Sequence, residues 1–259
     1  MRNKLERLKR IRELMSENNQ VTVAYLSELF DVSEQTIRSD LENLENEGFL
    51  TRFHGGASVN SMSLHSYGNR IFGNEIANST IKQKLGKAAA NIVTNKESIF
   101  IGPGTSVYYI ALELSKHPDI HANIVTNNFY VASILNGCSN FRLQFIGGIS
   151  QLDLGYTACD DLERELDNKF FDKLFFSTDG ADLSHGYTLS DPPAHSTITL
   201  AGEHSQQIVS LIDSAKFDRQ SFFKIGDLDY AQTVVTDSGI PDSFLKHFNS
   251  LGVNTIVVD

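Results

Sequence analysis

The 259-residue chain lacks the patterns that mark secreted, membrane-spanning or metal-binding proteins. Its only two cysteines, Cys138 and Cys159, are too few for a disulfide framework and lack the paired spacing of a zinc site. No apolar run approaches the roughly 20 residues that a membrane helix needs. The first residues, MRNKLERLKRIREL, lack the continuous apolar segment of a signal peptide. These absences predict a cytoplasmic protein that needs no metal and no cofactor.

The chain is also short of basic residues, with 22 Lys and Arg against 32 Asp and Glu and a net charge of −10. Such a deficit argues against a nucleic-acid-binding protein unless the charges are segregated along the chain. They are segregated, because residues 1–12 carry six basic side chains against the single Glu6, whereas residues 59–259 carry 14 basic and 22 acidic residues. The length favours two domains, a small basic one followed by a larger acidic one.

Residues 1–58 contain three amphipathic helix patterns followed by a hairpin pattern. Apolar residues at helical spacing mark the three helices, namely Leu5, Leu8, Ile11 and Leu14, then Val23, Leu26, Leu29 and Phe30, then Ile37, Leu41 and Leu44. Thr22 and Ser33 are predicted to cap the second and third helices. Gly48 ends the third helix, and residues 49–53 followed by His54-Gly55-Gly56 predict a β-hairpin. This is the layout of a winged helix-turn-helix domain.

The third helix is the predicted DNA-reading element. With its apolar side facing inward, the polar residues around its N-terminus face outward: Ser33, Gln35, Thr36, Arg38 and Ser39. Gln pairs with adenine and Arg with guanine, while Thr contacts a thymine methyl group or a phosphate. We expect Lys9, Arg10, Arg12, Arg52 and His54 to contact the DNA backbone or the minor groove. A three-helix protein-interaction module with the same core is the alternative.

Residues 57–80 are rich in Ser, Asn and Gly, which predicts a linker over 59–80 between a DNA-binding domain, 1–58, and a second domain, 81–259. In the second domain, apolar runs alternate with helix-length stretches. The runs lie at 98–101, 123–125, 143–146, 173–176, 208–212, 233–235 and 255–258. This alternation predicts a doubly wound α/β domain, in which ligands bind beyond the carboxyl ends of the strands.

The predicted strand ends are polar and rich in glycine. They supply the residues that we expect to bind a ligand, which are Gly102, Gly104, Thr105, Ser106, Thr126, Asn127, Gly147, Gly148, Asp179, Asp182 and Lys216. Hydroxyls, glycine backbone and a helix N-terminus suit a phosphate, and carboxylates suit sugar hydroxyls. A plain tight turn is the alternative for any single loop.

The stretch VAYLSELFDVSEQTIRSDLENLENEGFLTRFHGG resembles the signature of the DeoR family of bacterial transcriptional regulators. The motifs Gly104-Thr105-Ser106, Thr126-Asn127, Gly147-Gly148, Asp179-Gly180-x-Asp182 and Asp213-Ser214-x-Lys216 are similar to that family's effector domain. The resemblance implies an effector domain related to ribose-5-phosphate isomerase, a phosphorylated sugar or polyol as effector, a double-stranded DNA operator, and a homodimer or homotetramer. The chain departs from the family pattern at Ser39, Gly102 and Ile198, where the family tends to carry Arg, an acidic residue and a nearby Lys.

A sugar-phosphate isomerase with an accessory DNA-binding domain is the alternative from another functional class. Aldose–ketose isomerisation needs a carboxylate that moves a proton and a cation that stabilises the enediolate. Residues 184–203 contain no Lys or Arg, although Lys216 and Glu203 could substitute. His195 is expected at the surface or at a helix cap. We therefore predict a non-enzymatic repressor controlled by a phosphorylated sugar.

Overall fold

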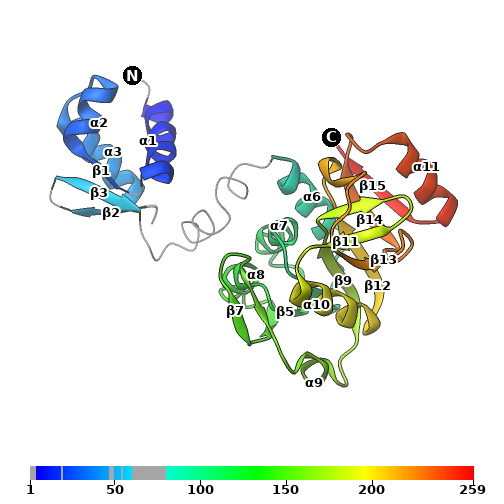
Figure 1. Ribbon diagram of the computed structural model, residues 1–259. Helices are drawn as coiled ribbons and strands as arrows, with labels where there is room; N and C mark the ends of the chain where they lie inside the picture. Colours follow the sequence, from blue (N-terminus) through cyan, green and yellow to red (C-terminus); the bar gives the residue numbers. More distant parts are fainter. Residues whose placement is uncertain (1–3, 19, 47–49, 54, 60–79) are drawn as a thin grey trace. The chain divides into compact units, whose positions relative to one another are not determined.

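The computed structural model describes residues 4–18, 20–46, 50–53, 55–59 and 80–259. The chain divides into a small unit, residues 1–77, and a large unit, residues 78–259 (Figure 1). Within the described ranges, none of the helices combines the length and the apolar character that crossing a membrane requires.

The described residues of the small unit form three helices and a three-stranded antiparallel sheet. Its elements are α1 (Lys4–Asn18), β1 (Gln20–Thr22), α2 (Val23–Phe30), α3 (Glu34–Asn46), β2 (Leu50–Phe53) and β3 (Gly56–Val59). The strands lie in the order β1-β3-β2, so the predicted hairpin is confirmed and gains β1 as a third strand. The expected ends at Gly48 and His54, like most of the expected linker, lie outside the described residues.

Apolar side chains from all three helices form the core of the small unit. Ile11, Leu26, Ile37 and Leu44 are fully buried, as their spacing predicts. Leu29 is 48% exposed, so its assignment to the buried stripe of α2 is wrong; Val23, Leu26 and Phe30 suffice to cover that face. The Thr22 hydroxyl accepts a hydrogen bond from the Tyr25 N–H at 3.2 Å, which confirms the predicted cap.

A buried ion pair joins α1 to α3. The Arg7 guanidinium donates to both carboxylate oxygens of Asp40, at 2.5 and 3.3 Å, and the two side chains are almost fully buried. Arg7 therefore does not belong to the exposed basic face that the charge pattern suggests. The pair fixes the first helix against the third.

The large unit is built on a seven-stranded parallel sheet. Its strands are β4 (Ser98–Ile101), β5 (Ala122–Thr126), β6 (Phe141–Phe145), β9 (Phe171–Ser177), β12 (Ser205–Leu211), β14 (Thr233–Asp237) and β15 (Asn254–Val258). All seven predicted strands are present, in the order β15-β14-β12-β9-β4-β5-β6. The chain runs outward from β4 through β5 to β6 and then returns to the other side of β4 as β9. The topological switch point therefore lies between β4 and β9.

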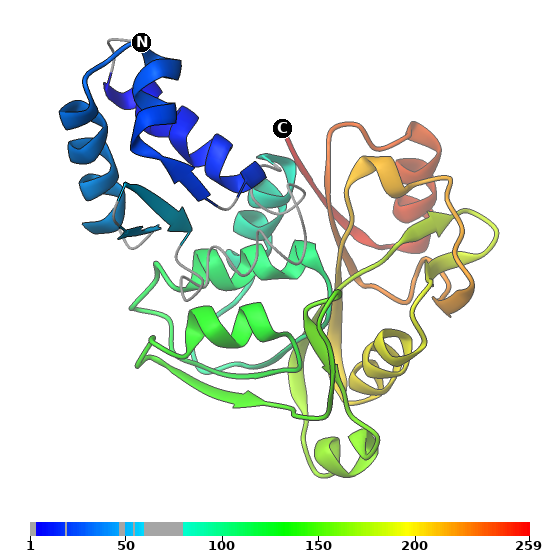
Figure 2. The ribbon, with the colours of Figure 1, turned by 60° about the vertical axis from the view of Figure 1, so that its left-hand side comes forward.

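Helices cover both faces of the sheet, as the doubly wound prediction requires. One face packs α6 (Thr80–Ala90), α7 (Thr105–Leu114) and α8 (Phe129–Leu135), and the other packs α9 (Leu162–Leu166), α10 (Pro192–Glu203) and α11 (Asp242–Leu251). Figure 2 shows α7 and α8 lying side by side. Because strand residues alternate between the two faces, Phe175 joins the core under α7 and Phe176 joins the core under α10.

Five short antiparallel strands were not predicted. They are the hairpin β7 (Ile149–Gln151) and β8 (Tyr156–Ala158), and the small sheet of β10 (Gly180–Asp182), β11 (Gly186–Leu189) and β13 (Phe223–Gly226). The hairpin follows the edge strand β6, whereas β10 and β13 follow the interior strands β9 and β12.

Candidate functional site

In the small unit, the N-terminal turns of α3 present the predicted reading residues to solvent. The Ser33 hydroxyl accepts a hydrogen bond from the Thr36 N–H at 3.2 Å and caps the helix. Gln35, Arg38 and Ser39 are exposed, and Thr36 is half-buried. Arg38 forms an exposed ion pair with Glu34 at 2.9 Å. This surface offers amide, guanidinium and hydroxyl groups from one helix end, which is the chemistry of base reading in a major groove.

The proposed phosphate contacts fall into two groups. Lys9 and Arg10 are exposed on α1, and Arg12 is half-buried. Arg52 on β2 is held by Glu45 of α3, whose carboxylate accepts from the Arg52 Nε at 2.7 Å and from its N–H at 2.9 Å. These hydrogen bonds lower the pKa of Glu45 below its ordinary value and raise the pKa of Arg52. Arg52 thus links the β-hairpin to the reading helix.

In the large unit, the loop after β4 contacts the end of β9 at the switch point. Gly104 has a φ of +114°, and a Cβ at this position would lie 2.0 Å from the Ser177 Oγ. Glycine is therefore required for both conformation and space. The Gly102 N–H donates to the Phe175 carbonyl at 2.9 Å, and a side chain at position 102 would approach Ile198 of α10. Gly102 and Ile198, two of the three positions at which the chain departs from the family pattern, are therefore neighbours.

Two of the predicted ligand residues, Thr105 and Ser106, begin α7, and a lysine of α6 that was not predicted contacts one of them. The Lys82 Nζ of α6 donates to the Thr105 Oγ1 at 3.0 Å. Ser106 is fully buried, and its hydroxyl has no hydrogen-bond partner among the described residues. A cation and the Thr105 hydroxyl thus meet at a helix N-terminus, next in sequence to the buried Ser106 hydroxyl, and such an arrangement suits an anion.

The end of β5 connects this loop to the other face of the sheet. Thr126 donates from its hydroxyl to the Ile101 carbonyl at 2.6 Å. On the α7 face, the Asn128 amide donates to the Gly104 carbonyl at 3.1 Å. On the opposite face, the Asn127 amide donates to the Thr157 carbonyl at 2.8 Å and lies 3.4 Å from the Thr197 Oγ1 of α10. The Asn127 Oδ1 is buried without a partner among the described residues.

Beyond β9 and β12, the structure places Asp179 and Lys216 close together. The Lys216 Nζ donates to the carbonyl of Thr178, the residue before Asp179, at 2.6 Å. The Asp179 carboxylate accepts from the N–H and the hydroxyl of Ser190, at 2.9 and 2.5 Å. Asp179 is exposed and fixed in orientation, so it is placed to accept hydrogen bonds from a hydroxylated ligand.

Three predicted residues lie outside this group. Gly147 and Gly148 follow β6 and are exposed, and a Cβ at Gly148 would collide with the Ala158 carbonyl at 2.1 Å. Asp182 is the last residue of β10, and its carboxylate accepts from the Ser184 and His185 N–H groups of the following turn at 2.9 and 3.0 Å. These bonds, and that from the His185 ring, lower the pKa of Asp182. Its role in the structure is to hold this turn.

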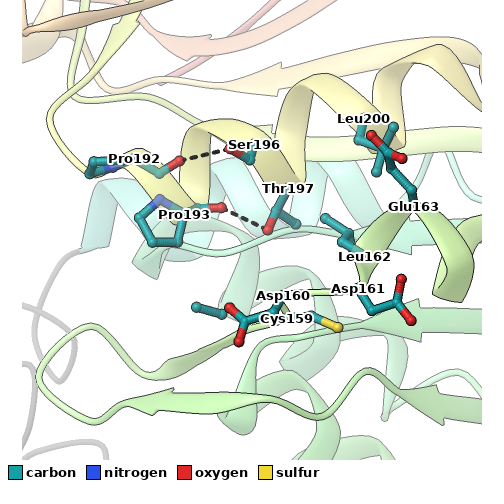
Figure 3. Close-up of a pocket in the computed structure, with 11 residues that line it drawn as sticks. Cys159, Asp160, Asp161, Leu162, Glu163, Pro192, Pro193, Ser196, Thr197 and Leu200 are labelled. Carbon is teal, nitrogen blue, oxygen red and sulfur yellow. Dashed lines mark hydrogen bonds between the residues drawn. The ribbon is translucent and has the colours of Figure 1, made fainter.

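A pocket of about 580 Å³ lies between α10 and the β8–α9 segment (Figure 3). Its lining includes Asp160, Asp161 and Glu163 but no basic residue, together with Cys159 and Thr197. Thr197 also contacts Asn127, so the pocket borders the end of β5. Its acidic lining suits the hydroxyl-rich part of a ligand better than a phosphate. No group of three His, Cys, Asp or Glu within the described ranges is arranged to hold a metal ion.

His195, for which the sequence favours a surface or capping position, turns away from this site. Its Nε2 lies 2.8 Å from the Lys224 carbonyl of β13, and its ring packs against Phe223. Sequence reasoning missed Lys82, Asn128 and Thr197, because each depends on a contact between segments more than 20 residues apart. Of these three, only Asn128 could have been found from its neighbours in the sequence, because Asn before an apolar run is typical of a helix N-cap.

Comparisons with known proteins match both units. Residues 7–63 match the family described as "DeoR-like helix-turn-helix domain", and residues 77–238 match "DeoR C terminal sensor domain". The lactose phosphotransferase system repressor of Lactococcus lactis subsp. lactis is 30% identical over 247 residues, which cover 95% of this chain and 96% of that protein. The protein of the same name from Staphylococcus aureus (strain NCTC 8325 / PS 47) is 32% identical over 243 residues, covering 91% and 92%. A solved ribose 5-phosphate isomerase A from Methanocaldococcus jannaschii has a TM-score of 0.40 and 16% identity, covering 52% of this chain and 53% of that one.

Proposed function

Because this chain belongs to the DeoR family of transcriptional regulators, we propose that it represses a sugar- or polyol-utilisation operon in the cytoplasm. A phosphorylated sugar or polyol binds the large unit and changes the affinity of the small unit for its operator. The observation that carries this proposal is the contact of Lys82 with Thr105 at the N-terminus of α7, beside Ser106, whose buried hydroxyl has no partner among the described residues.

The phosphoryl group of the effector is expected at this helix N-terminus. The Lys82 ammonium already contacts Thr105, and the Ser106 hydroxyl lacks a protein partner within the described ranges. A buried hydroxyl without a partner costs about 1–3 kcal/mol, so a ligand that supplies one gains affinity there. The sugar portion then extends toward Asn127, whose Oδ1 is likewise unpartnered, and toward the acidic pocket beyond Thr197.

The placement of Glu203 argues against the isomerase alternative. Glu203 is the last residue of α10 and does not line the pocket, whose lining along this helix ends one turn earlier at Leu200. Twelve helical residues span about 18 Å at 1.5 Å per residue, so Glu203 lies far from the helix end that holds the N-cap Asp191. One residue separates Glu203 from the start of β12, so it belongs to the amino edge of the sheet. General acid–base chemistry needs a group within hydrogen-bond reach of the reacting proton.

The ligand site is tested by thermal unfolding of the full chain in the presence of pentose, hexose, hexosamine and polyol phosphates, with inorganic phosphate as a reference. A ligand at 100 times its Kd stabilises the large unit by about 2.7 kcal/mol. We expect Lys82→Met and Thr105→Val to abolish that stabilisation and to leave ligand-free operator binding intact. Lys84→Met on the same helix is the matched control, since the Lys84 ammonium contacts the carbonyl of Asp259 instead.

Two results would contradict the proposal. Undiminished stabilisation of Lys82→Met by the sugar phosphate would place the phosphoryl group elsewhere. Incorporation of solvent deuterium at C1 or C2 of the bound sugar, lost on Asp179→Asn, would establish isomerisation and make the small unit an accessory to an enzyme.

A further inference from the structure

The carboxyl end of β6 and the β7–β8 hairpin form an exposed apolar patch on the large unit. Phe145 is 37% exposed, Leu154 42%, and Ile149 and Leu152 60% each. We refer to these four residues as the hairpin patch. Residues 143–158 carry Asp153 as their only charge, although 21% of the whole chain is charged. Contiguous apolar surface of this kind marks an interaction site.

The hairpin patch lies at an edge of the central sheet. Among the described strands, β6 pairs only with β5, and β7 pairs only with β8. This edge is at the opposite end of the sheet from β15, as the labels of β7 and β15 show in Figure 1. An edge strand with apolar side chains is a template for pairing with another chain.

We infer that the hairpin patch is the surface through which two copies of this chain associate. Helix-turn-helix proteins read two half-sites as symmetric dimers, and a two-fold dimer places one patch against the same patch of the second copy. Self-contact favours a surface of low charge, because residues 59–259 carry 22 acidic against 14 basic residues and two copies with the same excess of negative charge repel each other. The hairpin patch is such a surface.

The base of the hairpin is hydrogen-bonded to the ligand site. The Thr157 N–H donates to the Asn127 carbonyl at 2.9 Å, and the Thr157 hydroxyl donates to the Ile146 carbonyl at 2.6 Å. The Phe129 N–H donates to the Gly155 carbonyl at 2.9 Å. A ligand that contacts Asn127 therefore acts on the segment that carries the association surface. This coupling rests on the proposed function, whereas the association itself does not.

The test is sedimentation velocity of the full chain without DNA over a range of concentrations. Wild type is expected to sediment as a dimer or a larger even oligomer. Leu152→Asp and Ile149→Asp are expected to raise the dissociation constant of the dimer at least tenfold. Phe222→Asp is the matched control, because Phe222 is 85% exposed and lies outside the hairpin patch. The variants should also lose at least tenfold in affinity for a two-half-site operator, with unchanged affinity for a single half-site.

A monomeric wild-type protein, or Leu152→Asp that associates like wild type, would overturn the inference. So would weakened association of Phe222→Asp alone. If Ile149→Asp fails to fold because Ile149 lies within β7, Leu152→Asp decides, since Leu152 lies in the turn between the strands. Sedimentation also separates this inference from the proposed function, because it is carried out without a sugar phosphate and does not depend on whether one binds.

Discussion

Gly102 and Ile198 show how two sequence differences can have one structural cause. A Cβ at position 102 would lie 3.3 Å from the Phe175 carbonyl and 3.8 Å from the Ile198 Cγ1. An acidic side chain there would point at the apolar Ile198, where burying an unpaired charge is costly. The small residue at position 102 and the apolar residue at position 198 therefore suit each other, where the resemblance leads one to expect an acidic residue and a nearby lysine.

At the residue scale, the reading surface is tested on α3. Gln35→Ala and Arg38→Ala should each weaken specific operator binding by about 1–3 kcal/mol and leave the melting temperature of the small unit unchanged, since both side chains are exposed. Titration of wild type and variants with operator DNA at fixed salt measures this loss. Glu42→Ala, an exposed position farther along the same helix, should bind like wild type. Normal operator binding by both α3 variants would show that another surface reads the DNA.

At the element scale, interior strands such as β4 and β9 were predictable because they are buried on both faces and read as apolar runs. The short strands were not, since three or four residues are too few to show a period of two. Leu29 fits the helical period of α2 as well as Leu26 does, yet Leu26 is buried and Leu29 is exposed. Tertiary packing, which the period does not reveal, decides which side of the helix is covered. Lys82 was missed for the same reason, because its contact with Thr105 arises only from the packing of α6 against α7.

Glu97 and Lys173 join the amino ends of β4 and β9, below the switch point. Burial works to raise the pKa of Glu97, but hydrogen bonds from the Lys173 ammonium and the Thr94 N–H outweigh it, so the pKa lies below its ordinary value. A carboxylate with a lowered pKa stabilises the fold above its ordinary pKa, and this contribution is lost as the pH falls through the lowered value.

Glu97→Gln should therefore lower the free energy of unfolding of the large unit by about 3 kcal/mol at pH 7, because Lys173 is left buried and unpaired. The difference from wild type should shrink at an acidic pH below the ordinary carboxyl pKa, because the unfolded chain there binds a proton that the native carboxylate resists. Urea denaturation at both pH values measures it. Asp227→Asn, which removes an exposed pair with Lys224, should cost less than about 1 kcal/mol. Equal stability of Glu97→Gln and wild type at pH 7 would contradict this prediction.

At the scale of the whole molecule, each hydrophobic cluster of the described residues draws its members from one unit. One cluster belongs to the small unit, and the two clusters on either side of the central sheet belong to the large unit. Cooperative unfolding extends only as far as shared packing, so we expect two thermal transitions rather than one. A sugar phosphate identified by thermal unfolding should raise the transition of the large unit alone.

Differential scanning calorimetry with and without that ligand measures both transitions. Asp40→Asn shows which transition belongs to the small unit, because it breaks the buried pair with Arg7 and should lower the temperature of that transition alone. A single transition that responds as a whole to both the ligand and Asp40→Asn would show that the units unfold together.

The adjacent amides of Asn127 and Asn128 reach opposite faces of the sheet, toward α10 and toward the loop before α7. This division depends on the alternation of side chains along an extended segment. Insertion or deletion of one residue between Ala122 and Asn128 would exchange the two faces and break both contacts. Across evolution, the length of this segment should therefore vary far less than the identity of its residues. Gene-wide insertion scanning would find β5 among the least permissive parts of the chain.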